Sequence, residues 1–287
     1  MEIKLGKINR LRVVKTVDFG VYLDGGDEAG EILLPTRYVP KDCKQNDELD
    51  VFLYLDQEER LIATTLKPKA QVGDFAYLKV AWVNQYGAFL DWGLMKDLFV
   101  PFREQKMRMQ QDKSYIVHVH IDEESYRIMA TAKIERYLKL PDNDTYKNGD
   151  EVNLLIVQKT DLGFKAIVDN LYMGLIYDSE IFRPLHTGDQ LKGYIKQIRP
   201  DGKIDLQLQT GKATEKVADF SEKLLLYLQR SNGHSDLNDK SDSQLVYEIF
   251  GVSKKVFKKG IGDLYKRRLI TLENGLTLTK EGRNIED

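Results

Sequence analysis

The chain has 287 residues, of which 42% are hydrophobic and 31% charged, and its formal net charge is -2. It is long enough for several small domains, and it has enough apolar residues to build their cores, which excludes a wholly disordered chain. A single cysteine, Cys43, excludes an internal disulfide, and no Cys/His spacing fits a zinc site.

Residues 1–6 lack the basic start and apolar stretch of a secretory signal. No later stretch approaches the roughly 20 apolar residues that cross a bilayer. We therefore expect a cytoplasmic protein with no membrane partner.

The sequence is internally repetitive. Residues 18–23 read DFGVYL, residues 85–90 read QYGAFL, and residues 161–166 read DLGFKA. Each segment is followed by further β-rich runs separated by Asn, Asp or Gly turns. This pattern predicts three copies of one small all-β module.

Each copy offers about five short strands, which fits a five-stranded Greek-key barrel of the OB type. Residues 67–70 form a short linker after the first copy, and a helix-like segment from Ile134 to Leu140, ended by Pro141, follows the second. The expected barrels span residues 1–67, 71–134 and 146–211.

Beyond residue 212 the pattern changes to helical spacing, starting with Ala218, Leu224, Leu225 and Leu228. Helices are predicted over residues 243–250 and 253–268, after a polar loop at 231–241. Asn274-Gly275 then predicts a β-hairpin. Three helices and a hairpin indicate a winged helix over residues 213–287, so the fold is mainly β with a C-terminal α+β domain.

The Phe-Gly-Val-Tyr-Leu and Tyr-Gly-Ala-Phe-Leu segments resemble the signature of the S1 RNA-binding domain. Three such domains followed by a winged helix resemble the conserved virulence factor B family of bacterial RNA-binding regulators. The resemblance implies single-stranded RNA as the partner and post-transcriptional control of gene expression as the role. We expect no cofactor and no small-molecule substrate.

Aromatic residues beside the motif glycine can stack on unpaired bases if the strand bends them onto the outer surface. Aromatic residues on strands more often belong to a core, but their recurrence at matching positions favours a binding platform. The expected platform residues are Phe19 and Tyr22 in the first repeat and Tyr86 and Phe89 in the second. In the resembled domain a third position lies on the next strand, and here it matches Leu33, Phe99 and Tyr177.

The resemblance also implies basic residues that contact phosphates: Arg37 and Arg60 in the first repeat, and Arg103 and Arg127 in the second. The third repeat departs from the motif, because Leu162 and Lys165 replace its aromatic residues and Phe164 is expected inside the barrel. This barrel is expected to contact the nucleic-acid backbone instead, through Lys165, Lys192, Lys196, Arg199 and Lys203.

Basic residues crowd one predicted helix of the last domain and its end. They can form a solvated helix face, enter a groove of nucleic acid, or belong to a protein-docking module. These residues are Lys254, Lys255, Lys258, Lys259, Lys266, Arg267 and Arg268, opposed by Asp263.

No phosphate-binding loop, nucleophile elbow or metal-binding helix motif is present, so we expect no enzymatic activity and no metal. His118 and His120 share a strand face and are expected to be a structural or titrating surface pair. The acidic residues 122–124 are expected to be a solvated turn. Two alternative functions remain, a DNA-binding transcriptional regulator led by the winged helix and an accessory subunit of an RNA-processing assembly.

Overall fold

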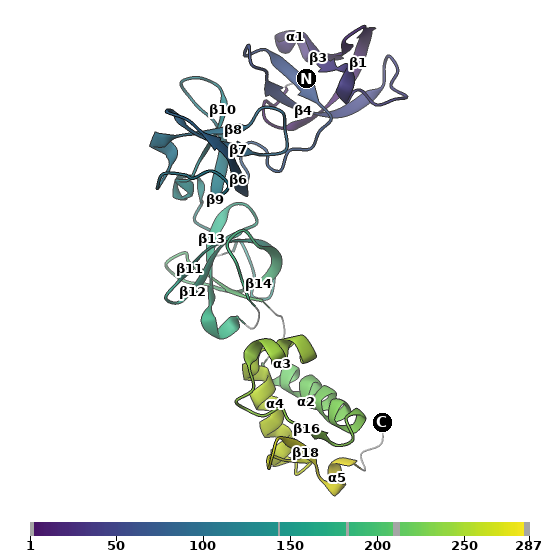
Figure 1. The fold of residues 1–287 in the computed structure, drawn as a ribbon, viewed down its shortest axis with the longest axis vertical. Helices are drawn as coiled ribbons and strands as arrows, with labels where there is room; N and C mark the ends of the chain where they lie inside the picture. The colour runs from purple at the N-terminus through teal and green to yellow at the C-terminus, as the bar shows by residue number, and fades with distance from the viewer. Residues whose placement is uncertain (1–2, 143, 182–183, 209–212, 284–287) are drawn as a thin grey trace. The chain divides into compact units, whose positions relative to one another are not determined.

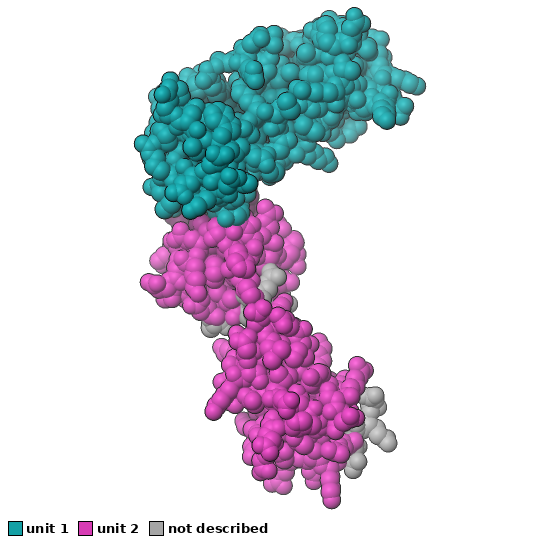
Figure 2. All heavy atoms as spheres, in the orientation of Figure 1, with its two compact units in different colours: residues 1–138 teal, residues 139–287 magenta. Residues whose placement is uncertain are grey.

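The computed structural model describes residues 3–142, 144–181, 184–208 and 213–283. Three closed five-stranded barrels are followed by a small region of helices and a three-stranded sheet (Figure 1). The chain divides into two compact units, residues 1–138 and 139–287, which are coloured separately in Figure 2. The predicted fold class is therefore confirmed.

The three barrels share one strand order. The first has the order β1-β2-β3-β5-β4, and the other two repeat it around their own closed sheets. The strands of the first barrel are β1 (Ile8–Val17), β2 (Gly20–Asp24), β3 (Glu31–Pro35), β4 (Glu48–Leu55) and β5 (Leu61–Thr64), with the short helices α1 (Gly26–Ala29) and η1 (Thr36–Tyr38) between them.

The later barrels are built in the same way. The second consists of β6 (Phe75–Val83), β7 (Gly87–Asp91), β8 (Leu98–Pro101), β9 (Ser114–Ile121) and β10 (Ile128–Thr131), with η2 (Phe102–Glu104) after β8. The third consists of β11 (Glu151–Thr160), β12 (Gly163–Val168), β13 (Tyr172–Tyr177), β14 (Gln190–Ile198) and β15 (Ile204–Gln207), with η4 (Asp178–Glu180) after β13.

The motif glycine begins the second strand of every barrel, where the third strand approaches closely. A Cβ atom on Gly20, Gly87 or Gly163 would lie 2.2, 2.3 or 2.0 Å from the carbonyl oxygen of Leu34, Val100 or Ile176 respectively. Backbone atoms cannot move aside as a flexible side chain can. Glycine is required here because of this close approach, in addition to the bend that the sequence predicts.

The first two barrels pack on each other within the first unit. Phe52 and Tyr54 of β4 belong to the same buried cluster as Trp92 and Leu94 of the second barrel. The Phe52 and Trp92 rings meet edge to face with centroids 5.6 Å apart. In addition, the Lys96 Nζ donates hydrogen bonds to the carbonyls of Leu55 (3.1 Å) and Asp56 (2.8 Å).

The segment after the second barrel is only partly helical. The prediction of a helix over residues 134–140 is wrong beyond Tyr137, because only η3 (Ile134–Tyr137) forms and Leu138 is extended. Tyr137 stacks on His118, with ring centroids 3.9 Å apart and an interplanar angle of 19°.

The histidine pair of β9, predicted to be either structural or a titrating surface pair, is packed into the structure. His118 is 6% exposed and also packs against Phe75, while His120 is half-buried. Burial lowers the pKa of His118 to about 4 and also lowers the pKa of His120. Burial therefore favours the neutral form of His118 in the folded chain.

The C-terminal region contains α2 (Ala213–Arg230), β16 (His234–Ser235), α3 (Ser243–Phe250), α4 (Lys254–Lys266), β17 (Ile270–Thr271), β18 (Leu276–Leu278) and α5 (Lys280–Arg283). The predicted hairpin forms around Asn274 and Gly275, which adopt φ of 56° and 100°. β16 was not predicted. It lies within residues 231–241, where a polar loop was expected, and it pairs with β18.

The predicted domain limits remain predictions. The expected boundary between the third barrel and the winged helix falls at residues 209–212, outside the described residues, and the side chain of Ala218 is also outside the description.

The core of the C-terminal region includes Phe220, Leu224, Phe257 and Leu276, all nearly inaccessible to solvent.

We expect Gly87→Ala to destabilise the second barrel by about 1 to 3 kcal/mol, because the new Cβ overpacks against the Val100 carbonyl. Chemical denaturation of the full chain, with hydrogen exchange to localise the loss to β7 and β8, measures this. Gly262→Ala is the matched control, since a Cβ there meets nothing within 4 Å. Its expected effect is neutral or slightly stabilising. Equal losses in the two variants would contradict the steric explanation.

We expect the burial of His118 to make the first unit less stable in acid. Its folded pKa lies below the ordinary value of 6.5, so the unfolded chain binds the proton more readily. The resulting stability is complete above pH 6.5 and is lost as the pH falls toward 4. His118→Phe keeps a ring beside Tyr137 and removes this titration. Unfolding midpoints of both proteins, followed from pH 7 to pH 5, should diverge in favour of the variant, whereas parallel profiles would refute the assignment.

Candidate nucleic-acid interface

A β-bulge in the first strand of each barrel sets up the candidate surface. The bulges lie between Val13 and Lys15, between Val80 and Trp82, and between Ile156 and Gln158. Just after each bulge, a residue of the first strand faces outward. It pairs with the motif residue of the second strand that also faces outward. These pairs are Lys15 with Tyr22, Trp82 with Phe89, and Gln158 with Lys165.

The pairing continues across the next two strands, so each barrel carries a row of four neighbouring side chains. We call this set the outer row. It consists of Lys15, Tyr22, Leu33 and Ile62 in the first barrel, Trp82, Phe89, Phe99 and Met129 in the second, and Gln158, Lys165, Leu175 and Asp205 in the third.

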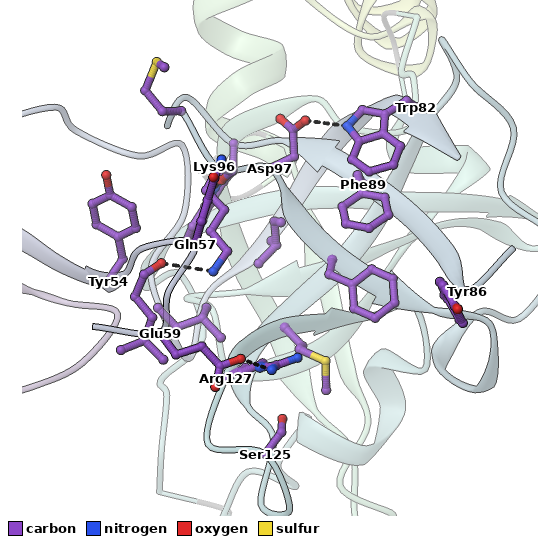
Figure 3. Close-up of a pocket in the computed structure, with 17 residues that line it drawn as sticks. Tyr54, Gln57, Glu59, Trp82, Tyr86, Phe89, Lys96, Asp97, Ser125 and Arg127 are labelled. Carbon is purple, nitrogen blue, oxygen red and sulfur yellow. Dashed lines mark hydrogen bonds and ion pairs between the residues drawn. The ribbon is translucent and has the colours of Figure 1, made fainter. Parts of the chain in front are cut away.

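Three of the four residues in the outer row of the second barrel are aromatic (Figure 3). Trp82 lies parallel to Phe89, with ring centroids 3.7 Å apart and an interplanar angle of 3°. The Phe89 and Phe99 centroids are 4.9 Å apart. The Trp82 Nε1–H donates a hydrogen bond of 2.8 Å to Asp97, which fixes the indole. The three rings thus contact one another and form one apolar cluster at the groove.

This aromatic row lines a groove of 830 Å³. Tyr86 also lines the groove and is 65% exposed at the turn before β7. The first barrel supplies part of the lining through the segment from Tyr54 to Glu59, which belongs to the same compact unit. Lys96 and Arg127 bring positive charge to the groove, while Glu59 and Asp97 bring negative charge.

The expected phosphate-binding arginines of the second barrel both have carboxylate partners. Arg127 forms an ion pair with Glu59 of the first barrel. Arg103 pairs with Asp122 (3.2 Å) and with Glu124 (3.7 Å). The prediction that residues 122–124 are simply solvated is therefore wrong for Asp122, whose side chain is only 14% exposed and whose pKa is lowered, first by a hydrogen bond from Ser125.

The first barrel presents a smaller aromatic pair. Phe19 is 57% exposed and meets Tyr22 edge to face at 6.3 Å. The Lys15 ammonium lies over the Tyr22 ring at 4.7 Å. Leu33 and Ile62 complete its outer row without further rings. The basic candidates here are Arg37, which lies over the Tyr38 ring, and Arg60, which pairs with Asp56 and Glu58.

The third barrel differs more than the sequence predicts. Strand register places Leu175 opposite Lys165, whereas Tyr177 pairs with Gly163. Tyr177 is therefore not the counterpart of Phe99, because the residue that pairs with Lys165 lies two positions earlier in β13. Phe164 is 9% exposed and belongs to the barrel core, as expected.

Charge replaces aromatic surface on this barrel. Asp205 takes the last place in its outer row, is 4% exposed, and pairs with Arg199 at 2.8 Å. Most of the basic residues that were expected to contact the nucleic-acid backbone form ion pairs: Lys192 with Glu151, Lys196 with Glu180 and Lys203 with Asp201. Lys165 is exposed.

The basic residues of the last domain lie on and after α4. Lys255, Lys258 and Lys259 are exposed on the helix, opposite its buried residues Phe257 and Ile261. Lys254 is half-buried and donates to the Lys240 carbonyl (3.2 Å). The remaining candidates, Lys266, Arg267 and Arg268, are exposed at the end of the helix, and Arg267 pairs with Asp263.

Sequence reasoning missed Trp82 and Met129 as members of the outer row. A fixed sequence spacing could have identified the first-strand member of the row. Lys15, Trp82 and Gln158 each precede their paired motif residues, Tyr22, Phe89 and Lys165, by the same number of positions. A β-bulge is needed to turn these residues outward, and it cannot be recognised from alternation alone.

Two family models match the chain at its ends. The model of the S1 domain matches residues 5–66, and the model described as a CvfB-like winged helix domain matches residues 222–278. The predicted resemblance to the conserved virulence factor B family is confirmed. Proteins of that name are similar over nearly the whole chain.

Among these relatives, conserved virulence factor B of Staphylococcus epidermidis is 26% identical over 97% of this chain and 96% of its own. The protein YitL of Bacillus subtilis is 29% identical over 94% of this chain and 92% of its own. A solved structure of a multidomain protein with nucleic acid binding domains, from Streptococcus pneumoniae, covers 96% of this chain and 98% of its own, with 20% identity and a TM-score of 0.42.

Among the described residues, no helix is long and apolar enough to cross a membrane. The same part of the chain contains no cluster of three or more His, Cys, Asp or Glu side chains that could hold a metal ion.

Proposed function

We propose that the chain binds single-stranded RNA on the aromatic outer row of its second barrel and acts as a post-transcriptional regulator. The observation that carries this proposal is the cluster of Trp82, Phe89 and Phe99 in an open groove, where Trp82 stacks face to face on Phe89 and Phe99 lies next to Phe89. Each base has a flat π face, and stacking on an aromatic side chain is worth about 1 to 3 kcal/mol per base.

The geometry favours an unpaired strand over a duplex. Bases in a duplex are already stacked on their neighbours, whereas bases of a single strand can turn outward onto a protein surface. Hydroxyl and carboxylate groups at the groove, from Ser125 and Asp97, can hydrogen-bond a ribose 2′-hydroxyl. The match of residues 5–66 to the S1 domain model is consistent with this proposal.

The charge of the chain is compatible with stacking as the main source of affinity. Its net charge is -2, and Arg127 at the groove is already paired. Few counterions are then released on binding, so we expect a shallow dependence of affinity on salt concentration.

We expect the triple variant Trp82→Ala, Phe89→Ala, Phe99→Ala to weaken binding of a labelled single-stranded RNA by tenfold to several hundredfold, from a loss of about 1 to 3 kcal/mol per unstacked base. The salt dependence should be largely kept, because no charge is removed. Fluorescence anisotropy at several salt concentrations, with single-stranded RNA, single-stranded DNA and duplex DNA, measures both quantities.

Tyr77→Ala is the matched control, because Tyr77 is 40% exposed on the same barrel but lies outside the groove lining. It should bind RNA like the unmodified chain. Stronger binding of duplex DNA, with no effect of the triple variant, would shift the function to the winged helix.

A second candidate function is contact between α4 and duplex nucleic acid. It is favoured by the exposed lysines Lys255, Lys258 and Lys259, whose spacing places them on one helix face. α4 precedes the hairpin of β17 and β18, the position of a groove-reading helix in a winged helix.

If α4 contacts a duplex, replacing these three lysines with glutamine should weaken duplex binding and reduce its salt slope by about 0.9 per lost phosphate contact. The same anisotropy titration measures the slope. Binding of single-stranded RNA to the second barrel should change little. An unchanged duplex affinity and slope would leave these lysines as a solvated face.

A further inference from the structure

The groove beside the aromatic outer row has a wall from a different barrel. The loop between β4 and β5 carries Gln57 and Glu59, and both line the groove together with Phe89 and Phe99 (Figure 3). The shared core of Phe52 and Trp92 packs the two barrels together.

Glu59 is held at the tip of that loop by a tight turn. Asp56 accepts hydrogen bonds from the backbone N–H groups of Glu58 (2.8 Å) and Arg60 (2.9 Å). Glu59 itself adopts a left-handed conformation with φ of 64°. Lys96 binds the carbonyls of Leu55 and Asp56, which ties the start of the loop to the second barrel.

The Glu59 carboxylate pairs with the Arg127 guanidinium across the groove. Arg127 immediately precedes β10, which carries Met129 of the outer row. A guanidinium binds a phosphate through the same paired N–H groups that it uses for a carboxylate. Glu59 and a phosphate of a bound strand therefore require the same donor groups.

We propose that Glu59 of the first barrel competes with the nucleic-acid backbone for Arg127, so that the first barrel limits the affinity of the second barrel for RNA. This inference rests on the proposed function. An RNA strand whose bases stack on the outer row places a phosphate near Arg127, and the guanidinium exchanges its carboxylate partner for that phosphate.

The exposure of the pair makes the exchange feasible. The Arg127 and Glu59 side chains are 55% and 51% exposed, so water screens their attraction and the pair is weak. The other arginine of this barrel is held differently. Arg103 pairs with Asp122, whose side chain is 14% exposed and also accepts hydrogen bonds from Ser125. Arg127 is therefore the more easily released of the two.

The test is a double-mutant cycle on the full chain, read by anisotropy with a labelled single-stranded RNA. We expect Glu59→Gln to tighten binding by about two- to fivefold, in keeping with the small worth of an exposed ion pair. Arg127→Ala should weaken binding. Adding Glu59→Gln to Arg127→Ala should then give no tightening, because the guanidinium for which Glu59 and the phosphate compete has been removed.

Glu123→Gln is the matched control. It removes the same charge from the exposed loop before Arg127, and its affinity should stay within the error of the unmodified chain. Equal tightening by Glu59→Gln with and without Arg127 would show general charge repulsion and overturn the competition. So would an unchanged affinity in Glu59→Gln.

These failures are distinguishable from failure of the proposed function. If RNA binding is lost in the Trp82, Phe89, Phe99 triple variant while Glu59→Gln has no effect, the stacking surface stands and only the competition is wrong. If the unmodified chain does not bind RNA, both proposals fall together.

Discussion

The close approach of two backbones at the motif glycine governs the candidate surface of every barrel. Gly20, Gly87 and Gly163 leave no room for a side chain, since the facing carbonyl already occupies that space. This contact fixes the pairing of the second and third strands, and pairing fixes which side chains face outward. This steric constraint places the second- and third-strand residues of the outer row in all three barrels, and the β-bulge places the first-strand residue.

The repeated frame allows each barrel to change its surface without changing its fold. Inward positions remain apolar in all three copies, as Val21, Ala88 and Phe164 show. Outward positions are free to vary, so Phe89 of the second barrel corresponds to Tyr22 in the first and to Lys165 in the third. The barrels are therefore structural repeats with different expected ligand preferences.

The three barrels and the winged helix could be predicted from the sequence, because strand alternation and the glycine motif recur at matching positions. The site could be predicted only in part. Phe89 and Phe99 follow from the motif, but Trp82 depends on a bulge and Tyr177 was misplaced because register is a property of paired strands. The Arg127–Glu59 pair joins separate repeats, and no local pattern predicts such a contact.

The net charge of -2 at first argues against a chain that binds a polyanion, and the second barrel offers a physical resolution. Stacking needs apolar aromatic rings, and the cluster of Trp82, Phe89 and Phe99 supplies them without any charge. Of the two cations that line the groove, Arg127 is paired with the carboxylate of Glu59, whereas Lys96 donates to backbone carbonyls. A long polyanion would gain little from such a surface by general attraction. Under the proposed function, an unpaired strand that stacks its bases would gain the most, which is why we expect a preference for single strands over duplexes.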